Sequence, residues 1–240
     1  MIIENSIALV TGANKGIGRE LVNALLTHGA KKIYAAGRDA KSLEPVTAID
    51  PTRVVPLVLD ITKMAEIDNA MKSAPDVTLL INNAGVATSF NVLTSPEDSF
   101  HRDMEVNYFG TLQVIRKFVP ILEENGGSLV NVISIVALAS APGMSGYSAS
   151  KAALHSVTQS LRVELGKKGV KVHAIFPGII DTDMAKGLDI PKTAPKVVAE
   201  NVLAGVAKGD EDIFPDPMSE QLQHLRLKDL KEFERRLGTF

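Results

Sequence analysis

Short runs of apolar, often β-branched residues recur along the chain and alternate with segments that have helical spacing. Runs that are apolar nearly throughout are typical of strands buried on both faces of a parallel sheet. They occupy 7–11, 33–36, 54–59, 77–81, 129–134 and 170–176. The clearest helical segments are 17–28 and 154–165, and a glycine follows each of them. Because alternating strands and helices favour βαβ units with right-handed crossovers, the pattern predicts an α/β chain with a doubly wound parallel sheet.

The domain organisation is simple. No internal repeat, low-complexity stretch or change of composition marks a second domain, so we predict one domain over 1–218. In the remaining tail, 219–240, residues 220–237 have the spacing of a charged amphipathic helix. We interpret this helix as one that lies on the surface or packs between subunits.

The charge balance and the lack of cysteine exclude several classes of function. The 26 Lys and Arg residues nearly balance the 28 Asp and Glu residues, whereas a nucleic-acid-binding protein usually has a basic face. Without cysteine, the chain has no disulfide, thiolate metal site or cysteine nucleophile. The 5 histidines are scattered without the spacing of metal ligands, so we expect no metal site.

The hydropathy of the chain gives no sign of export or membrane insertion. The first residues lack the basic segment and the long apolar core of a signal peptide. No run approaches the about 20 apolar residues that a helix needs to cross a bilayer. We therefore expect a cytoplasmic protein that does not bind a membrane.

A glycine-rich turn with the sequence TGANKGIG, over 11–18, joins the first predicted strand to the first predicted helix. Gly12, Gly16 and Gly18 allow a tight turn, a close backbone approach to a pyrophosphate, and close contact between helix and strand. The start of the helix adds free N–H donors and a positive dipole end. Glycines also collect in ordinary turns for steric reasons. The position after the first strand, however, favours a dinucleotide site.

The end of the second predicted strand bears on the choice of cofactor. NAD-binding proteins usually place a carboxylate here for the ribose 2′-hydroxyl, while NADP-binding proteins use arginine for the 2′-phosphate. Gly37 occupies the expected acidic position and Arg38 follows it, while Lys15 adds a second cation. We therefore expect NADP(H) in preference to NAD(H). Asp39 leaves the use of NAD(H) open, because a small error in the strand end would bring its carboxylate into play.

Tyr147 and Lys151 are four residues apart in a predicted helix, so their side chains share one face. A free tyrosine has a pKa near about 10 and keeps its proton at neutral pH. A neighbouring ammonium favours the phenolate and lowers that pKa, which allows the tyrosine to exchange protons. Proton transfer at this pair and a dinucleotide at the glycine turn together indicate an oxidoreductase.

With the glycine turn, Asn82-Asn83-Ala84-Gly85, Ser134 and the Tyr147–Lys151 pair in this order, the chain resembles the short-chain dehydrogenases/reductases. The resemblance extends from residue 7 to about 217 and is to the compact, single-domain branch of that family. It implies a Rossmann-like sheet of about seven strands with helices on both faces and a last strand at 212–215.

The resemblance also implies a catalytic role for each of four residues. Tyr147 would be the general acid/base, and Lys151 would lower its pKa and hold the nicotinamide ribose. Ser134 would hydrogen-bond the substrate oxygen, and Asn107 would hold a water that links Lys151 to solvent. Asn82 is open to a structural interpretation, in which it ties adjacent strands together. The expected cofactor contacts are Gly12, Asn14, Lys15, Gly16, Ile17, Gly18, Arg38, Asp60, Ile61, Asn83, Ala84, Gly85, Tyr147, Lys151, Pro177, Gly178, Ile180 and Thr182.

The expected reaction is hydride transfer between NADP(H) and a carbonyl compound or secondary alcohol. Residues 137–144 are small and apolar, which favours an uncharged or weakly polar substrate. The stretch 177–184 also resembles β-ketoacyl carrier-protein reductases, so a fatty-acyl ketone is a second possibility. A non-catalytic NADP-sensing regulatory or scaffold protein is a third, which the intact Ser134, Tyr147 and Lys151 disfavour.

Two further expectations concern assembly and the acidic residues near 182. By analogy with the family we expect a homodimer or homotetramer that packs through the helices near 107–123 and 147–164. Asp181 and Asp183 form a carboxylate pair in sequence, which we interpret as loop or helix-capping residues and not as a metal site.

Overall fold

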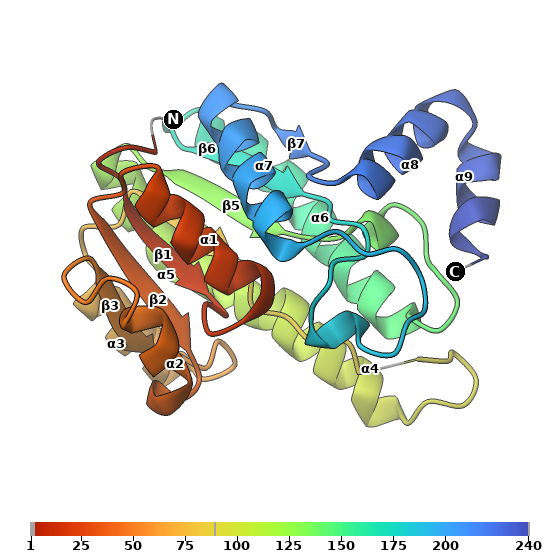
Figure 1. Cartoon of the computed structure of the whole chain (residues 1–240), viewed down its shortest axis with the longest axis horizontal. Coiled ribbons are helices and arrows are strands. Elements are labelled where there is room, and N and C mark those ends of the chain that lie inside the picture. Colours follow the sequence, from red (N-terminus) through yellow and green to blue (C-terminus); the bar gives the residue numbers. More distant parts are fainter. Residues whose placement is uncertain (1–2, 89, 240) are drawn as a thin grey trace.

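In the computed structural model, which describes residues 3–88 and 90–239, the chain forms a seven-stranded sheet with the order β3-β2-β1-β4-β5-β6-β7 (Figure 1). Its strands pair in parallel. The order reverses between β1 and β4, as in a doubly wound sheet. The predicted Rossmann-like α/β fold is therefore confirmed. The strands are β1 (Ile7–Thr11), β2 (Lys32–Gly37), β3 (Val54–Val58), β4 (Leu79–Asn82), β5 (Ser128–Val132), β6 (Lys171–Ile175) and β7 (Asp212–Ile213).

Helices cover both faces of the sheet, as the apolar strands predicted (Figure 1). One core cluster joins α1, α2 and α7 to strand residues such as Val10, and another joins α3, α5 and the end of α6 to Leu9. Successive strand residues point to opposite faces, so neighbours in sequence belong to different clusters. The helices are α1 (Gly16–Thr27), α2 (Ala40–Thr47), α3 (Met64–Ser73), α4 (Glu97–Met104), α5 (Thr111–Asn125), α6 (Ser145–Gly166), α7 (Pro195–Lys208), α8 (Pro217–Lys228) and α9 (Leu230–Leu237).

Three short helical turns complete the described elements: η1 (Glu105–Gly110), which is π-helical, and the 3₁₀ turns η2 (Ile135–Ala137) and η3 (Asp183–Ala185). Over the two described ranges, no helix is long and apolar enough to cross a membrane.

Several strands end earlier than the apolar runs that predicted them. β5 ends at Val132 and β6 at Ile175, although Ile133 and Phe176 are almost fully buried. These two side chains belong to a cluster with Leu154 of α6, which covers the ends of the strands. The apolar runs therefore report burial, which continues beyond the last paired residues of the sheet.

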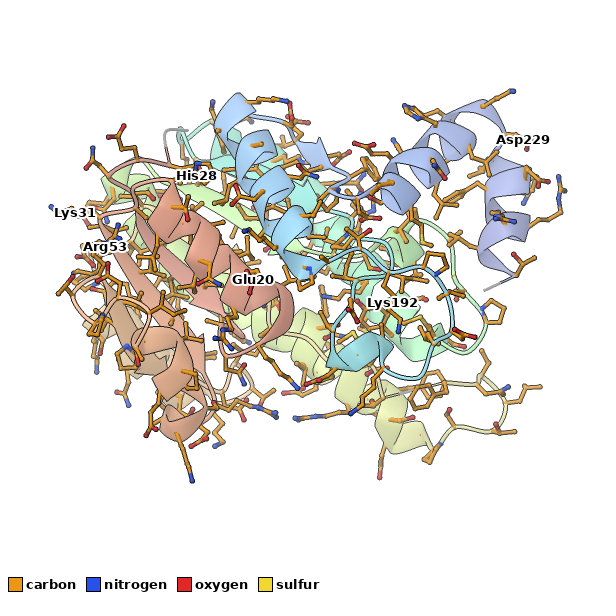
Figure 2. The ribbon with its side chains drawn as sticks, in the orientation of Figure 1. Glu20, His28, Lys31, Arg53, Lys192 and Asp229 are labelled. Atoms are coloured by element: carbon orange, nitrogen blue, oxygen red, sulfur yellow. The ribbon has the colours of Figure 1, made fainter. Side chains whose placement is uncertain are left out.

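The C-terminal tail differs from its prediction. Instead of one helix over 220–237, the structure has α8 and α9, and the chain turns sharply at Asp229 between them (Figure 2). Asp229 has an extended backbone (φ −151°, ψ 96°), and its carboxylate accepts a hydrogen bond from the N–H of Glu232 at 3.0 Å. The aspartate thus ends one helix and caps the next, a role that amphipathic spacing alone does not reveal.

The two C-terminal helices also bury three of their apolar residues against the rest of the protein. Leu222, Phe233 and Leu237 are almost completely buried, and they share a cluster with Ile135 and Tyr147. The tail thus packs one apolar face on the domain, as amphipathic surface helices do, and its packing between subunits stays a prediction. The domain boundary at 218 stays a prediction.

A helical glycine in α7 provides a test of how tightly the sheet edge is packed. A Cβ atom on Gly205 would lie 2.7 Å from the Cγ1 and Cδ1 atoms of Ile213 in β7. We expect Gly205→Ala to lower the free energy of unfolding by about 1–3 kcal/mol, because overpacking outweighs the gain of about 1 kcal/mol in helix propensity. Urea denaturation measures this change.

Gly166, in the last turn of α6, is the matched control. A Cβ atom there would meet no atom within 4 Å among the described residues. We expect Gly166→Ala to be neutral or to stabilise the protein by up to about 1 kcal/mol. Equal unfolding free energies for the two variants would contradict the packing described for Gly205.

Candidate active site

The glycine turn lies at the carboxyl end of β1, and its three glycines lie close to neighbouring atoms. Gly12 and Gly16 have positive φ angles of 65° and 56°, which favour glycine. A Cβ atom on Gly18 would lie 2.1 Å from the carbonyl oxygen of Gly12. Within the described structure, Lys15 makes no side-chain cap at the start of α1, so the first N–H groups of the helix stay available. This geometry fits a pyrophosphate group.

The segment after β4 is tied directly to the glycine turn. The amide of Asn83 donates to the carbonyl oxygens of Thr11 (3.0 Å) and Gly12 (3.2 Å). In return, the Thr11 hydroxyl accepts from the N–H groups of Asn83 (3.0 Å) and Ala84 (3.1 Å). These bonds cross the point where the strand order reverses, which is where doubly wound sheets bind ligands.

Asn82 has the structural role that we considered for it. Its side-chain amide donates to Asn131 Oδ1 at 2.9 Å and so joins β4 to β5. The Asn131 amide donates in turn to the hydroxyl of Thr158, also at 2.9 Å, which joins the sheet to α6. Asn82 therefore fixes the position of the helix that carries Tyr147.

Asn107 lies in the π-helical turn η1 and not in a regular helix. Its Oδ1 accepts from the N–H of Val86 (2.9 Å), and its amide donates to the carbonyl oxygen of Val86 (2.8 Å) and to Ser150 Oγ (2.9 Å). The Ser150 hydroxyl donates to the carbonyl oxygen of Tyr147 at 2.7 Å. The wider π turn thus brings Asn107 to α6, and such turns are frequent at functional sites. Its role as a water ligand stays a prediction.

Tyr147 and Lys151 are both buried, with exposed fractions of 8% and 3%. The Lys151 Nζ lies 5.7 Å from the centre of the Tyr147 ring and donates to the carbonyl oxygen of Val132 at 2.9 Å. Gly85 approaches the same ammonium, because a Cβ atom there would lie 3.4 Å from the Nζ. The structure thus brings Gly85 and the pair together.

Burial dominates the ionisation of this pair. Burial raises the pKa of Tyr147 to about 12, although a hydrogen bond with Ser134 lowers it in part. Burial also lowers the pKa of Lys151 to about 8. Both shifts favour the neutral forms, since charge is costly away from water. Burial is the largest influence on the pKa of each group, and the role of Lys151 in lowering the pKa of Tyr147 stays a prediction.

Ser134 follows β5 and links it to the segment after β6. Its hydroxyl donates to the carbonyl oxygen of Pro177 at 3.5 Å and accepts from the N–H of Val136 at 3.4 Å. The same Pro177 oxygen accepts from the N–H of Ile135 at 3.0 Å. The structure therefore places Ser134 between Tyr147 and the Pro177–Gly178 segment.

A buried carboxylate that we did not single out in the sequence lies close to these residues. Asp103, on α4, is fully buried, and its Oδ1 accepts hydrogen bonds from the N–H and the hydroxyl of Thr88, both at 2.8 Å. Its negative charge adds to the burial that raises the pKa of Tyr147. A lone acidic residue on a short polar helix gives no signal in the sequence that distinguishes it from a solvated one.

Near the second strand, the structure gives distinct roles to two neighbouring residues. β2 ends at Gly37, and the carboxylate of Asp39 accepts from the N–H groups of Lys41 (3.3 Å) and Ser42 (3.0 Å). Asp39 therefore caps α2. Arg38 is exposed. Burial raises the pKa of Asp60, but hydrogen bonds from Thr62, with smaller contributions from the charges of Lys63 and Arg38, lower it below its usual value.

Lys15 has a partner that we did not expect. Its Nζ lies 2.7 Å from Asp183 Oδ2, and both side chains are exposed. The hydrogen bond and the charge of Lys15 lower the pKa of Asp183. Asp183 is thus an ion-pair partner, and its bond joins the glycine turn to the loop after β6.

The remaining predicted contacts surround the same end of the sheet. Thr182 approaches the turn, because a Cβ atom on Gly16 would lie 3.2 Å from its methyl group. Ile180 pairs with Thr193 across the loop after β6. Asn14 lies in the turn, and Ile17 and Ile61 pack into the two core clusters. In the described parts of the chain, no group of three or more His, Cys, Asp or Glu residues is arranged to hold a metal ion.

Comparison with known proteins gives one consistent family. The model of the short chain dehydrogenase family matches residues 6–192. An uncharacterized oxidoreductase of Staphylococcus aureus strain MRSA252 is 37% identical over 213 residues, which cover 84% of this chain and 91% of the relative.

Solved structures agree with the sequence match. A short chain dehydrogenase from Burkholderia cenocepacia J2315, in complex with NADP, is 39% identical and superposes with a TM-score of 0.93 over 99% of both chains. A 3-ketoacyl-(acyl-carrier-protein) reductase from Brucella melitensis, complexed with NADH, is 27% identical with a TM-score of 0.80 over 90% of this chain and 93% of that one.

The buried charge of Asp103 gives a testable effect on Tyr147. We expect Asp103→Asn to lower the pKa of Tyr147, because removing a nearby negative charge makes the phenolate less costly. The chain has 3 tyrosines and no tryptophan, so ultraviolet titration of the phenolate is well suited. Subtracting the titration of the same protein with Tyr147→Phe isolates the signal of Tyr147.

Glu97→Gln on α4 is the control, since Glu97 is an exposed acidic residue of the same helix. It removes the same charge in a position screened by solvent and should leave the titration of Tyr147 unchanged. An unchanged Tyr147 pKa in Asp103→Asn would contradict the electrostatic role of Asp103.

Proposed function

The chain belongs to the short-chain dehydrogenase family, and we propose that it is an NADP(H)-dependent oxidoreductase acting on a carbonyl compound or secondary alcohol. The observation that carries the proposal is the buried set of Ser134, Tyr147 and Lys151 at the end of the sheet that holds the glycine turn. A hydroxyl, a phenol and an amine in one buried site supply hydrogen bonds and a proton for a reacting oxygen.

When bound, the cofactor supplies or accepts the hydride. Tyr147, whose pKa of about 12 keeps it protonated at neutral pH, donates its proton to the carbonyl oxygen as the carbon is reduced. Ser134 lies within hydrogen-bonding reach of Tyr147 and orients the same oxygen. In the reverse reaction, deprotonated Tyr147 accepts the proton of the alcohol. Because the pKa of Tyr147 is raised, the rate of alcohol oxidation should increase with pH.

Lys151 has two features that suit it to hold a ribose next to this proton donor. Its ammonium donates to the carbonyl oxygen of Val132, which leaves other N–H donors for a ligand. Its pKa of about 8 allows it to gain and lose a proton near neutral pH. Lys151 can therefore pass a proton toward the phenol through ligand hydroxyls.

The preference for NADP(H) rests on Arg38 and Lys15. Arg38 is exposed at the end of β2, and Asp39, the acidic residue next to it, is occupied as the cap of α2. The Burkholderia relative, described in complex with NADP, supports this choice. Lys15 is available to a 2′-phosphate only after it leaves Asp183, so Arg38 is the principal cation of the proposal.

A second candidate substrate is a β-ketoacyl thioester. The Brucella relative is described as a 3-ketoacyl-(acyl-carrier-protein) reductase, and this chain shares its fold. The partly buried Leu138, Ala139 and Met144 near Tyr147 are compatible with an acyl chain. A panel of ketones, aldehydes and acetoacetyl-coenzyme A, assayed by oxidation of NADPH, ranks these substrates.

Replacing the proposed proton donor tests the mechanism. We expect Tyr147→Phe to lower kcat by at least about 100-fold while NADPH still binds, because only the phenolic proton is lost. Tyr108→Phe removes a hydroxyl in η1 and should keep full activity. Full turnover by Tyr147→Phe would contradict the assignment. NADPH binding without turnover of any carbonyl by the unmodified protein would favour an NADP-sensing protein instead.

The cofactor preference has its own test. We expect Arg38→Asp to lower the ratio of kcat/KM for NADPH to that for NADH by about tenfold or more, since a charge-assisted bond is lost and a repulsive charge gained. Lys41→Asp, on the exposed face of α2, makes the same charge change away from the strand end and serves as the control. Equal ratios in the two variants would rule out a 2′-phosphate role for Arg38.

A further inference from the structure

The start of α8 is hydrogen-bonded to Gly178, which follows the Pro177 that contacts Ser134. Asp216, which caps α8, is almost completely buried. Its carboxylate accepts from the N–H of Gly178 (2.8 Å), the N–H of Ser219 (3.0 Å) and the hydroxyl of Ser219 (2.9 Å). Three donors on one buried carboxylate leave the first turn of α8 little freedom relative to Gly178.

Met218, in that first turn, packs directly on Gly178. A Cβ atom on Gly178 would lie 3.2 Å from both the Cβ and the Cγ of Met218, and 2.8 Å from Asp216 Oδ1. Gly178 follows Pro177, whose carbonyl oxygen accepts the hydroxyl of Ser134. Met218 therefore contacts Gly178, and the residue before Gly178 contacts the hydroxyl of Ser134.

The apolar cluster around Tyr147 contains residues from both C-terminal helices. Leu222 of α8 and Phe233 and Leu237 of α9 are buried in it. Met218 and Leu225 of α8 are only partly buried and pack against the same cluster, as does Met144. Met218 therefore keeps part of its surface accessible while it packs on the cluster that contains Tyr147. The helices lie at the end of the molecule opposite β3 (Figure 1).

We propose that α8 forms a wall of the substrate pocket and that Met218 limits the size of the apolar group beside the reacting carbonyl. The substrate class is then a ketone whose carbonyl carries an uncharged apolar group. This inference rests on the proposed reductase function. The buried carboxylate of Asp216 holds the wall in place, so the wall can discriminate between substrates by the size of their apolar groups. A group too large for the site would strain the protein.

Two methyl ketones that differ in bulk test the proposal: 2-butanone and 3,3-dimethyl-2-butanone. We expect Met218→Ala to raise the kcat/KM of the bulky ketone relative to the small one by about tenfold, since deletion of side-chain atoms in an apolar pocket changes selectivity by at least this factor. The NADPH dissociation constant, measured by fluorescence, should stay within about twofold. An unchanged ketone ratio would overturn the proposal.

Leu227→Ala is the matched control, because Leu227 is an apolar residue of the same helix that is 72% exposed. It should alter neither the ketone ratio nor NADPH binding. If it changed the ketone ratio as much as Met218→Ala, the effect would report on the helix as a whole and overturn the role of Met218.

A binding measurement separates this inference from the proposed reaction. Calorimetric titration of the NADPH complex of Tyr147→Phe with each ketone requires no turnover. Tighter binding of the bulky ketone by about tenfold when Met218→Ala is added supports the wall, and unchanged affinities overturn it. Failure of the unmodified protein to reduce either ketone, or any other carbonyl tested, would overturn the reductase function alone.

Discussion

The close approach of β1 and β4 at the point where the strand order reverses is the constraint on which the rest of the site depends. Only glycine fits at position 18, because any side chain would collide with the carbonyl of Gly12. The amide and backbone bonds between Asn83 and Thr11 then hold the two strand ends together across 72 residues of sequence. This junction places the glycine turn beside the segment after β4, in which Gly85 approaches the ammonium of Lys151.

Burial and polar contact oppose one another around Tyr147 and Lys151. The low-polarity surroundings favour the phenol and the neutral amine. A hydrogen bond between Tyr147 and Ser134, and one from Lys151 to the carbonyl oxygen of Val132, give each group one partner. Burying two polar groups costs free energy unless neighbouring groups are held in position to hydrogen-bond them. The links through Asn107 and Ser150 on one side, and through Asn82 and α6 on the other, supply that support.

The sequence predicted the fold and the residues that meet at the site better than it predicted their electrostatics. Periodicity indicated the sheet, because buried parallel strands are apolar throughout, and the glycine turn depends on local sterics. The break at Asp229 and the π turn around Asn107 depend on hydrogen bonds that hydrophobic spacing does not encode. The burial that raises the pKa of Tyr147 and the pairing of Lys15 with Asp183 depend on segments distant in sequence, so a residue list alone reveals neither.

The C-terminal helices close the apolar cluster at Tyr147 with residues that leave the ribosome after the whole sheet. A nascent chain that has reached β7 already contains the glycine turn, Ser134, Tyr147 and Lys151. It still lacks Phe233 and Leu237, which are almost fully buried in the finished protein. Because chains gain structure as they are synthesised, the apolar surface beside Tyr147 stays open to water and to chaperones until α8 and α9 have been made. Completion of this apolar cluster is then a later step than synthesis of the glycine turn.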